Sequence, residues 1–100
     1  MRVSGHAGAE QLGKDIVCAS VSMLTAMLAE MVLEAQDRGW LEYEPECELQ
    51  PGYSRIACVP KRKHKREIEY LFEGVCTGYE MLAQNYPGNV VIDAGIYPLQ

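Results

Sequence analysis

The chain has 100 residues, a length that is typical of one domain with a single hydrophobic core. Hydrophobic residues make up 48% and charged residues 23%, a globular composition that excludes wholesale disorder. The formal net charge of −5 argues against a protein that coats nucleic acid over its whole surface, although it allows a local basic patch. We therefore expect one domain over residues 1–100, without a linker or an internal repeat.

The four cysteines form no C-x-x-C pair and have no secretory context, so we expect reduced thiols in a cytoplasmic protein. Their spacing relative to the two histidines matches no compact zinc site, and we expect neither a metal ion nor a cofactor. The apolar run over residues 16–33 contains Ser20, Thr25 and Glu30, which argues against a membrane span. Acidic and glycine-rich sequence precedes the run, which argues against a signal peptide.

The first half of the chain predicts a strand end, a loop and a long helix. Residues 1–4 fit the end of a strand, and residues 5–14 hold three glycines, which favour a loop. Asp15 is the expected N-cap of the helix, and Arg38 and Gly39 are its expected stop. Apolar residues recur at helical spacing in between: Ile16, Ala19, Met23, Leu24, Met27, Leu28 and Met31. Because the helix is apolar nearly all round, we expect it to be buried centrally, with its methionines in the core.

The second half predicts a hairpin, a second helix and a last strand. From residue 41 apolar side chains alternate with glutamates, which predicts a strand with a buried face of Leu41, Tyr43, Cys47 and Leu49, and Pro45 within it suggests an edge position or a bulge. Residues 53–59 pair back after a turn, and residues 89–94 form a short strand. The helix between them has the core positions Ile68, Leu71, Phe72, Val75, Tyr79, Leu82 and Ala83. Cys58 and Cys76 are likewise expected to face the core. The predicted fold is an α/β (α+β) two-layer sandwich, with two helices on one face of a small mixed or antiparallel sheet.

Cys18 is the main candidate for chemistry, because it lies three residues after the expected cap, in the first helical turn. Unpaired N–H groups and the helix dipole favour a thiolate there, and a thiolate is the nucleophile of acyl transfer. His6 lies twelve residues upstream, across a loop that can bring its imidazole beside the sulfur. The same amides can hold an oxyanion, and Ser22 lies one turn beyond on the same face. The simpler alternative is a core cysteine, a solvated histidine and an ordinary cap.

The stretch SGHAG…GKDIVCASVS resembles the signature of the ribosomal-processing cysteine proteases, the Prp family. The matching residues are Gly5, His6, Ala7, Gly13, Asp15, Ile16, Val17, Cys18 and Ser22. The rest of the chain fits more loosely, through the order helix, hairpin, helix and strand. Relatives usually carry a strand hairpin before the glycine–histidine motif, where this chain has residues 1–4.

This resemblance implies a cytoplasmic thiol endopeptidase, a hydrolase that works as a homodimer on a protein substrate. It implies a catalytic dyad of Cys18 and His6, with Asp15 orienting or capping the site and a loop over residues 8–14 gating it. Gly5, Gly13 and Ser22 would support the site. The substrate would be the N-terminal extension of a large-subunit ribosomal protein, or a phage capsid or scaffold protein. The cut would follow a bulky aromatic residue in a short hydrophobic motif.

The run over residues 61–66 holds five cations: Lys61, Arg62, Lys63, Lys65 and Arg66. The other four basic residues stand against fourteen acidic ones, so the rest of the chain has a formal charge of −10. Positive charge opposes the dipole at a helix N-terminus, so helix stability does not explain the run. A solvated loop is the simpler interpretation, and contact with RNA, a ribosome or an acidic substrate region is the functional one. The rival function is thus a non-enzymatic module that binds a ribosome or RNA through this run.

Overall fold

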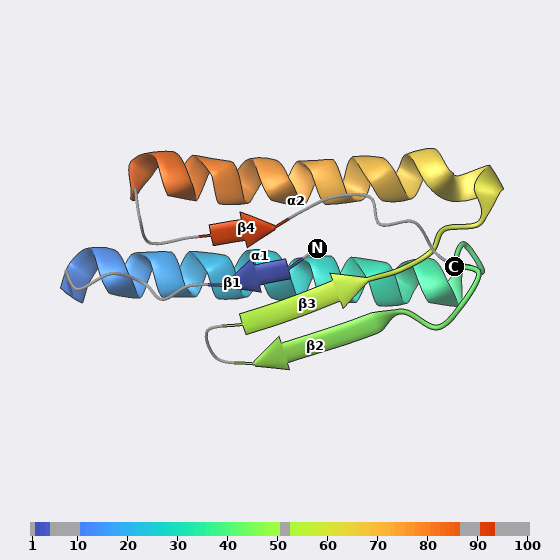
Figure 1. Cartoon of the computed structure of the whole chain (residues 1–100), viewed down its shortest axis with the longest axis horizontal. Helices are drawn as coiled ribbons and strands as arrows, with labels where there is room; N and C mark the ends of the chain where they lie inside the picture. The colour runs from blue at the N-terminus through green and yellow to red at the C-terminus, as the bar shows by residue number, and fades with distance from the viewer. Residues whose placement is uncertain (1, 5–10, 51–52, 87–90, 94–100) are drawn as a thin grey trace.

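The computed structural model describes residues 2–4, 11–50, 53–86 and 91–93. In chain order its elements are β1 (Arg2–Ser4), α1 (Gln11–Asp37), β2 (Glu46–Gln50), β3 (Tyr53–Ala57), the 3-10 turn η1 (Arg62–His64), α2 (Lys65–Asn85) and β4 (Val91–Asp93). The two helices run antiparallel to each other and form one layer, and the strands form the other (Figure 1). The predicted α+β sandwich is confirmed.

The sheet has four strands in the order β2-β3-β1-β4, and every neighbouring pair is antiparallel. The predicted hairpin is present: β2 and β3 pair from Glu46 opposite Ala57 to Gln50 opposite Tyr53. β1 lies between β3 and β4, so strands from the two ends of the chain are neighbours in the sheet. β2 is an edge strand, as the preceding Pro45 predicts.

The core lies between the two helices and β3, where α1 contacts β3 and α2 contacts β4. Its buried members are Leu28, Ala29, Val32, Ala35, Leu41, Ile56, Ile68, Val75 and Tyr79. On α2 the buried residues are spaced by seven and four, the pattern of one helical face, and they were all predicted from the sequence. Cys58 and Cys76 are half-buried against this core, as expected.

A buried hydrogen bond joins the two helices inside this core. The hydroxyls of Thr25 and Tyr79 lie 2.5 Å apart, and the Tyr79 side chain is fully buried. Each hydroxyl satisfies the other, so neither polar group is left without a partner away from water. The pair therefore fixes the register of α1 against α2 as well as filling space.

The methionine stripe of α1 is exposed, so the prediction that it fills the core is wrong. Met23 is 69% exposed, and Met27 and Met31 are also exposed. The buried face of α1 lies on the neighbouring side and contains Val17, Thr25, Leu28, Ala29, Val32 and Ala35. A helix that is apolar nearly all round can pack on either side. The smaller alanines and β-branched residues allow the closer approach of α2 and the sheet.

The predicted buried face of β2 is also wrong, because all five residues of this strand are exposed. Leu49 is 52% exposed, Tyr43 lies before the strand and is 68% exposed, and Cys47 is exposed. Only Leu41 is buried, through an isolated bridge to Pro60. The helix layer contacts β3 and β4, and β2 lies beyond its edge. A two-helix layer is too narrow to cover all four strands.

The end of α1 follows the predicted stop. Gly39 has a φ of +76°, a conformation that costs other residues energy because of their Cβ. The N–H of Gly39 donates to the carbonyl of Gln36, and the N–H of Trp40 donates to that of Ala35. This is a Schellman motif, which satisfies the last carbonyls of the helix and turns the chain toward β2.

Within the described residues, one helical segment, Ile16–Asp37, is long and apolar enough to cross a membrane by length and composition alone. In this fold the same segment packs against α2 and β3 through its buried face. Its exposed side carries Glu30 and Glu34, which would be costly in hydrocarbon. The absence of a membrane span therefore stays a prediction that these carboxylates support.

Candidate active site

Cys18 is the eighth residue of α1, and its side chain is exposed. The expectation that it lies in the first turn is wrong, because α1 begins at Gln11 rather than after Asp15. In an α-helix only the first four N–H groups lack a carbonyl partner within the helix. The backbone N–H of Cys18 therefore belongs to the regular hydrogen bonding of the helix and is not free. The helix terminus cannot supply the free amides that were expected to favour a thiolate and hold an oxyanion.

The same helix start corrects the role predicted for Asp15. This residue is inside α1 and is not its N-cap, and Gly13 also lies in the helix. Four of the seven residues in the predicted gating loop over 8–14 are thus helical. His6 and Gly5 lie outside the described residues. The six residues 5–10 join β1 to α1, so the candidate histidine is in the connection that leads directly to the cysteine's helix.

Ser22 is exposed and lies one turn beyond Cys18, so the two side chains share one flank of α1 as predicted from their spacing. Ser20 and Leu24 are offset by roughly half a turn and lie on the opposite flank. The flank that holds Cys18 and Ser22 is therefore the candidate reactive surface. Of the two serines near the cysteine, Ser22 is therefore the one that lies on the same flank as the sulfur.

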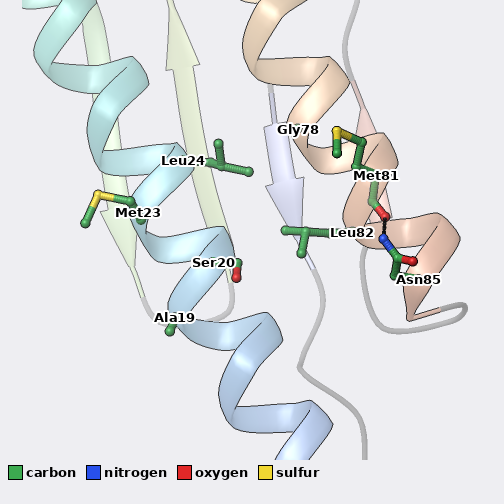
Figure 2. Close-up of a pocket in the computed structure, with 8 residues that line it drawn as sticks. All are labelled: Ala19, Ser20, Met23, Leu24, Gly78, Met81, Leu82 and Asn85. Atoms are coloured by element: carbon green, nitrogen blue, oxygen red, sulfur yellow. Dashed lines mark hydrogen bonds between the residues drawn. The ribbon is translucent and has the colours of Figure 1, made fainter.

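An open apolar groove runs between α1 and α2 on the other flank, with a volume of about 520 Å³. Figure 2 shows its lining residues: Ala19, Ser20, Met23, Leu24, Gly78, Met81, Leu82 and Asn85. Leu24 and Leu82 point into the space between the helices. A Cβ at Gly78 would lie 3.0 Å from the Leu24 methyl groups, so glycine permits this close approach. Cys18 does not line the groove. The groove is therefore not a pocket beside the candidate nucleophile.

The other three thiols are held in the protonated form more strongly than a free cysteine. Burial raises the pKa of the Cys58 thiol to about 11. Burial also raises the pKa of Cys76 and, although it is exposed, that of Cys47. Because the thiolate is the nucleophile, these three positions are poor sites for covalent catalysis near neutral pH. Exposure and thiol chemistry together single out Cys18.

A cluster around Trp40 is the arrangement that sequence reasoning missed. The rings of Trp40 and His64 stack with centroids 4.8 Å apart and an interplanar angle of 12°. The Arg38 guanidinium lies 5.3 Å from the centroid of the Trp40 ring. The two rings are 24 positions apart, so no local pattern signals their contact. Among the described residues, no three His, Cys, Asp or Glu side chains are grouped to hold a metal ion.

A protein-family model described as cysteine protease Prp matches residues 1–91 of the chain. The match covers both candidate residues of the dyad and extends through both helices to the last described strand. Neither the curated proteins nor the solved structures contain a significant match.

Proposed function

Because this chain belongs to the Prp family of cysteine proteases, we propose that Cys18 is the nucleophile and His6 the general base and acid. The chain is a cysteine protease of a family that acts in ribosomal protein processing. The observation that supports Cys18 is its exposure on α1, within the matched region. Cys47 is the other exposed cysteine, and it lies on the edge strand β2 with a raised pKa.

The proposed reaction has two stages. The Cys18 sulfur, deprotonated by His6, attacks the carbonyl carbon of the scissile peptide bond. The C–N bond breaks, the nitrogen takes the proton from His6, and an acyl-enzyme thioester is left. Water, deprotonated by His6, then attacks the thioester, which releases a carboxylic acid and restores the thiol. Because Cys18 lies beyond the first turn of α1, we propose that the His6 imidazole, and not the end of the helix, activates its thiol.

The proposed substrate is the short N-terminal extension of a large-subunit ribosomal protein, cut after an aromatic residue in a hydrophobic motif. Processing of a phage capsid or scaffold protein by the same chemistry is the alternative substrate. A ribosomal substrate favours a cytoplasmic location, and cysteines in the reduced form are typical of that compartment. Asp15, Gly13 and Gly5 are proposed to support the loop–helix junction that carries the dyad, and Ser22 to line it.

Incubation of the full chain with each substrate, followed by intact-mass spectrometry, tests this proposal. We expect one defined mass loss, equal to the N-terminal extension, from the ribosomal precursor. A precursor with alanine in place of the aromatic residue before the cut is the matched control, and it should stay intact. Cleavage of the phage protein alone would replace the proposed substrate. No cut in either protein under reducing conditions would contradict the proposed specificity.

We further propose that the active protein is a homodimer that buries the exposed apolar face of α1. This face is defined by Ile16, Met23, Met27 and Met31, which are all at least two-fifths exposed, and it borders the groove between the helices. Exposed apolar side chains that recur on one helix face form a patch of the kind that marks protein interaction sites. Glu30 and Glu34 on the same side favour a protein partner over a lipid one.

Sedimentation equilibrium is expected to give twice the chain mass of 11.2 kDa for the wild-type protein. Met23→Glu should shift the mass to that of one chain, because it places a charge in the middle of the buried patch. Tyr70→Glu, at a position 78% exposed on α2, is the control and should remain dimeric. A monomeric wild-type protein would contradict the dimer, and binding of the wild type to neutral lipid vesicles would assign the face to a membrane.

A further inference from the structure

The basic surface, defined as Lys61, Arg62, Lys63, Lys65 and Arg66, carries charge that the fold does not neutralise. All five side chains are exposed: Lys61 directly precedes η1, Arg62 and Lys63 lie in η1, and Lys65 and Arg66 lie in the first turn of α2. Among the described residues, Lys65 alone of the five has an ion pair, with Glu69 at 3.8 Å between two exposed side chains. The other four cations are exposed, and no carboxylate in the described part of the chain forms an ion pair with them. The run is solvated, as the simpler interpretation of the sequence expects, but from Arg62 onward it is helical and not a loop.

The backbone under these cations is held firmly. The N–H of Lys61 donates to the carbonyl of Trp40 at 2.7 Å, and the N–H of His64 donates to the carbonyl of Lys61 at 2.8 Å. The His64 ring stacks on Trp40, and its Nδ1 lies 2.7 Å from a carboxylate oxygen of Glu67. The one histidine inside the run therefore points inward as an anchor, whereas the five cations on either side of it project outward.

Stability of the fold does not account for this arrangement. Cations at a helix N-terminus oppose the helix dipole, and α2 has only Glu67 as an acidic residue in its first turn. Outside the run, the chain carries four basic and fourteen acidic residues. A polyanion would be repelled by most of the molecule and attracted at this one place. The charge distribution thus favours this place on the molecule for an anionic partner.

The geometry favours an extended polyanion over a compact anion. A phosphate or a single carboxylate is recognised by donors that converge on it, whereas these cations are spread along residues 61–66 and none of them is buried. A nucleic-acid backbone repeats its charge every few ångströms and can engage several dispersed cations at once. The proposed substrate, a ribosomal protein, is itself a component of an RNA-containing particle.

We propose that the basic surface is an RNA-binding surface through which this protease engages RNA next to its protein substrate. This proposal rests on the proposed protease function, because the RNA would lie next to the protease's substrate. The basic surface itself is separate from the Cys18–His6 dyad. Cys18 lies near one end of α1, and the basic surface lies beyond the other end (Figure 1). At 1.5 Å per residue, the helix between Cys18 and Asp37 alone spans about 28 Å. RNA on this surface leaves the sulfur free.

Fluorescence anisotropy with a labelled 20-nucleotide single-stranded RNA tests the proposal on the full chain. We expect binding that weakens steeply with salt, with a logarithmic slope of about 0.7 per phosphate contact. The variant Arg62→Gln/Lys63→Gln/Arg66→Gln should lower affinity at least about tenfold at 50 mM salt and reduce the slope by about 2. These side chains are exposed and away from the core, so thermal unfolding should be unchanged or shifted upward.

Arg55→Gln is the matched single-charge control for Arg62→Gln, because Arg55 is ion-paired with Glu46 on the sheet. It should leave RNA affinity unchanged, whereas Arg62→Gln should lower it. Equal effects of the two variants would overturn the proposal, and so would equally tight, equally variant-sensitive binding of polyglutamate, which would assign the surface to an acidic protein. Cys18→Ala should bind RNA normally, and the triple variant should cleave a free peptide normally. A failure of RNA binding is therefore distinguishable from a failure of the protease mechanism.

Discussion

Cys18→Ala is expected to abolish peptide cleavage, with kcat/KM falling by at least about 10⁴-fold. The substitution removes the sulfur that forms the thioester, and no neighbouring side chain can replace it in that role. The fold should survive, because Cys18 is exposed and alanine is the best helix former. Cleavage of a peptide that ends in the hydrophobic, aromatic motif, followed by chromatography, measures the effect, and circular dichroism checks the fold.

Two further variants separate the dyad from a general effect of thiol loss. Cys47→Ala removes the other exposed cysteine and should keep near wild-type activity. His6→Ala should lose nearly as much activity as Cys18→Ala, since the members of a catalytic unit act together and their losses are not additive. Wild-type rates in Cys18→Ala would rule out the proposed nucleophile.

Thiol labelling gives a readout that needs no substrate. At pH 6–7 iodoacetamide should label Cys18 before the other three cysteines, because burial raises the pKa of Cys47, Cys58 and Cys76. Cys58, with a pKa of about 11, should become reactive only in strongly alkaline solution. Slow and uniform labelling of all four positions would contradict an activated Cys18.

Tyr79→Ala is expected to lower the free energy of unfolding by about 4 kcal/mol, the cost of removing a fully buried aromatic ring. The Tyr79 side chain is 0% exposed, and its loss also leaves the Thr25 hydroxyl without its partner on the other helix. Domains of this size are stable by only about 5–15 kcal/mol, so the variant should lie near the edge of folding. Urea denaturation followed by circular dichroism measures the difference.

Tyr70→Ala is the control on the same helix, and it should change stability by less than about 0.5 kcal/mol because the ring is 78% exposed. Tyr79→Phe keeps the ring and should cost about 1 kcal/mol for the lost hydrogen bond.

Burial raises the pKa of Tyr79, and the hydrogen bond to Thr25 lowers it by less. The neutral phenol therefore stabilises the fold below pH 10, and this contribution is lost as pH rises above that value. As pH rises above 10, the free energy of unfolding of Tyr79→Phe should fall less than that of the wild type. An equal fall in both proteins would contradict the proposed contribution of the neutral Tyr79 phenol.

The elements were predictable because their signals are local. The hairpin follows from a turn between two alternating segments, and the buried face of α2 follows from a clear apolar stripe flanked by charge. α1 was predictable as a helix, but the face that it buries was not, because its own side chains are apolar nearly all round. Only the competition for close contact with α2 and β3 decides that Leu28 is buried and Met23 is exposed. The exposure of β2 depends in the same way on the width of the helix layer.

At the candidate site, the sequence identified Cys18 and a serine one turn beyond it on the same helix face, and the structure shows that Cys18 is exposed on α1. It failed on the helix start, because glycine at position 13 and aspartate at position 15 resemble a loop and a cap. The helix instead begins at Gln11, about one turn earlier than expected. Its N-terminal end, with the free amides and the positive end of the dipole, is therefore farther from Cys18. The stack of Trp40 on His64 depends on where two distant turns meet, which no local pattern encodes.

The length of α1 sets a requirement on what this protease can cut while it rests on RNA. A polypeptide in its most open form advances at most about 3.5 Å per residue, so a path along this helix takes roughly eight residues. A tail shorter than that, emerging beside the RNA, would fall short of the sulfur. If RNA is bound at the basic surface during cleavage, the length of α1 thus requires more than about eight extended residues between the RNA and the cut, and a shorter extension would be cut only from substrate that is free of that RNA.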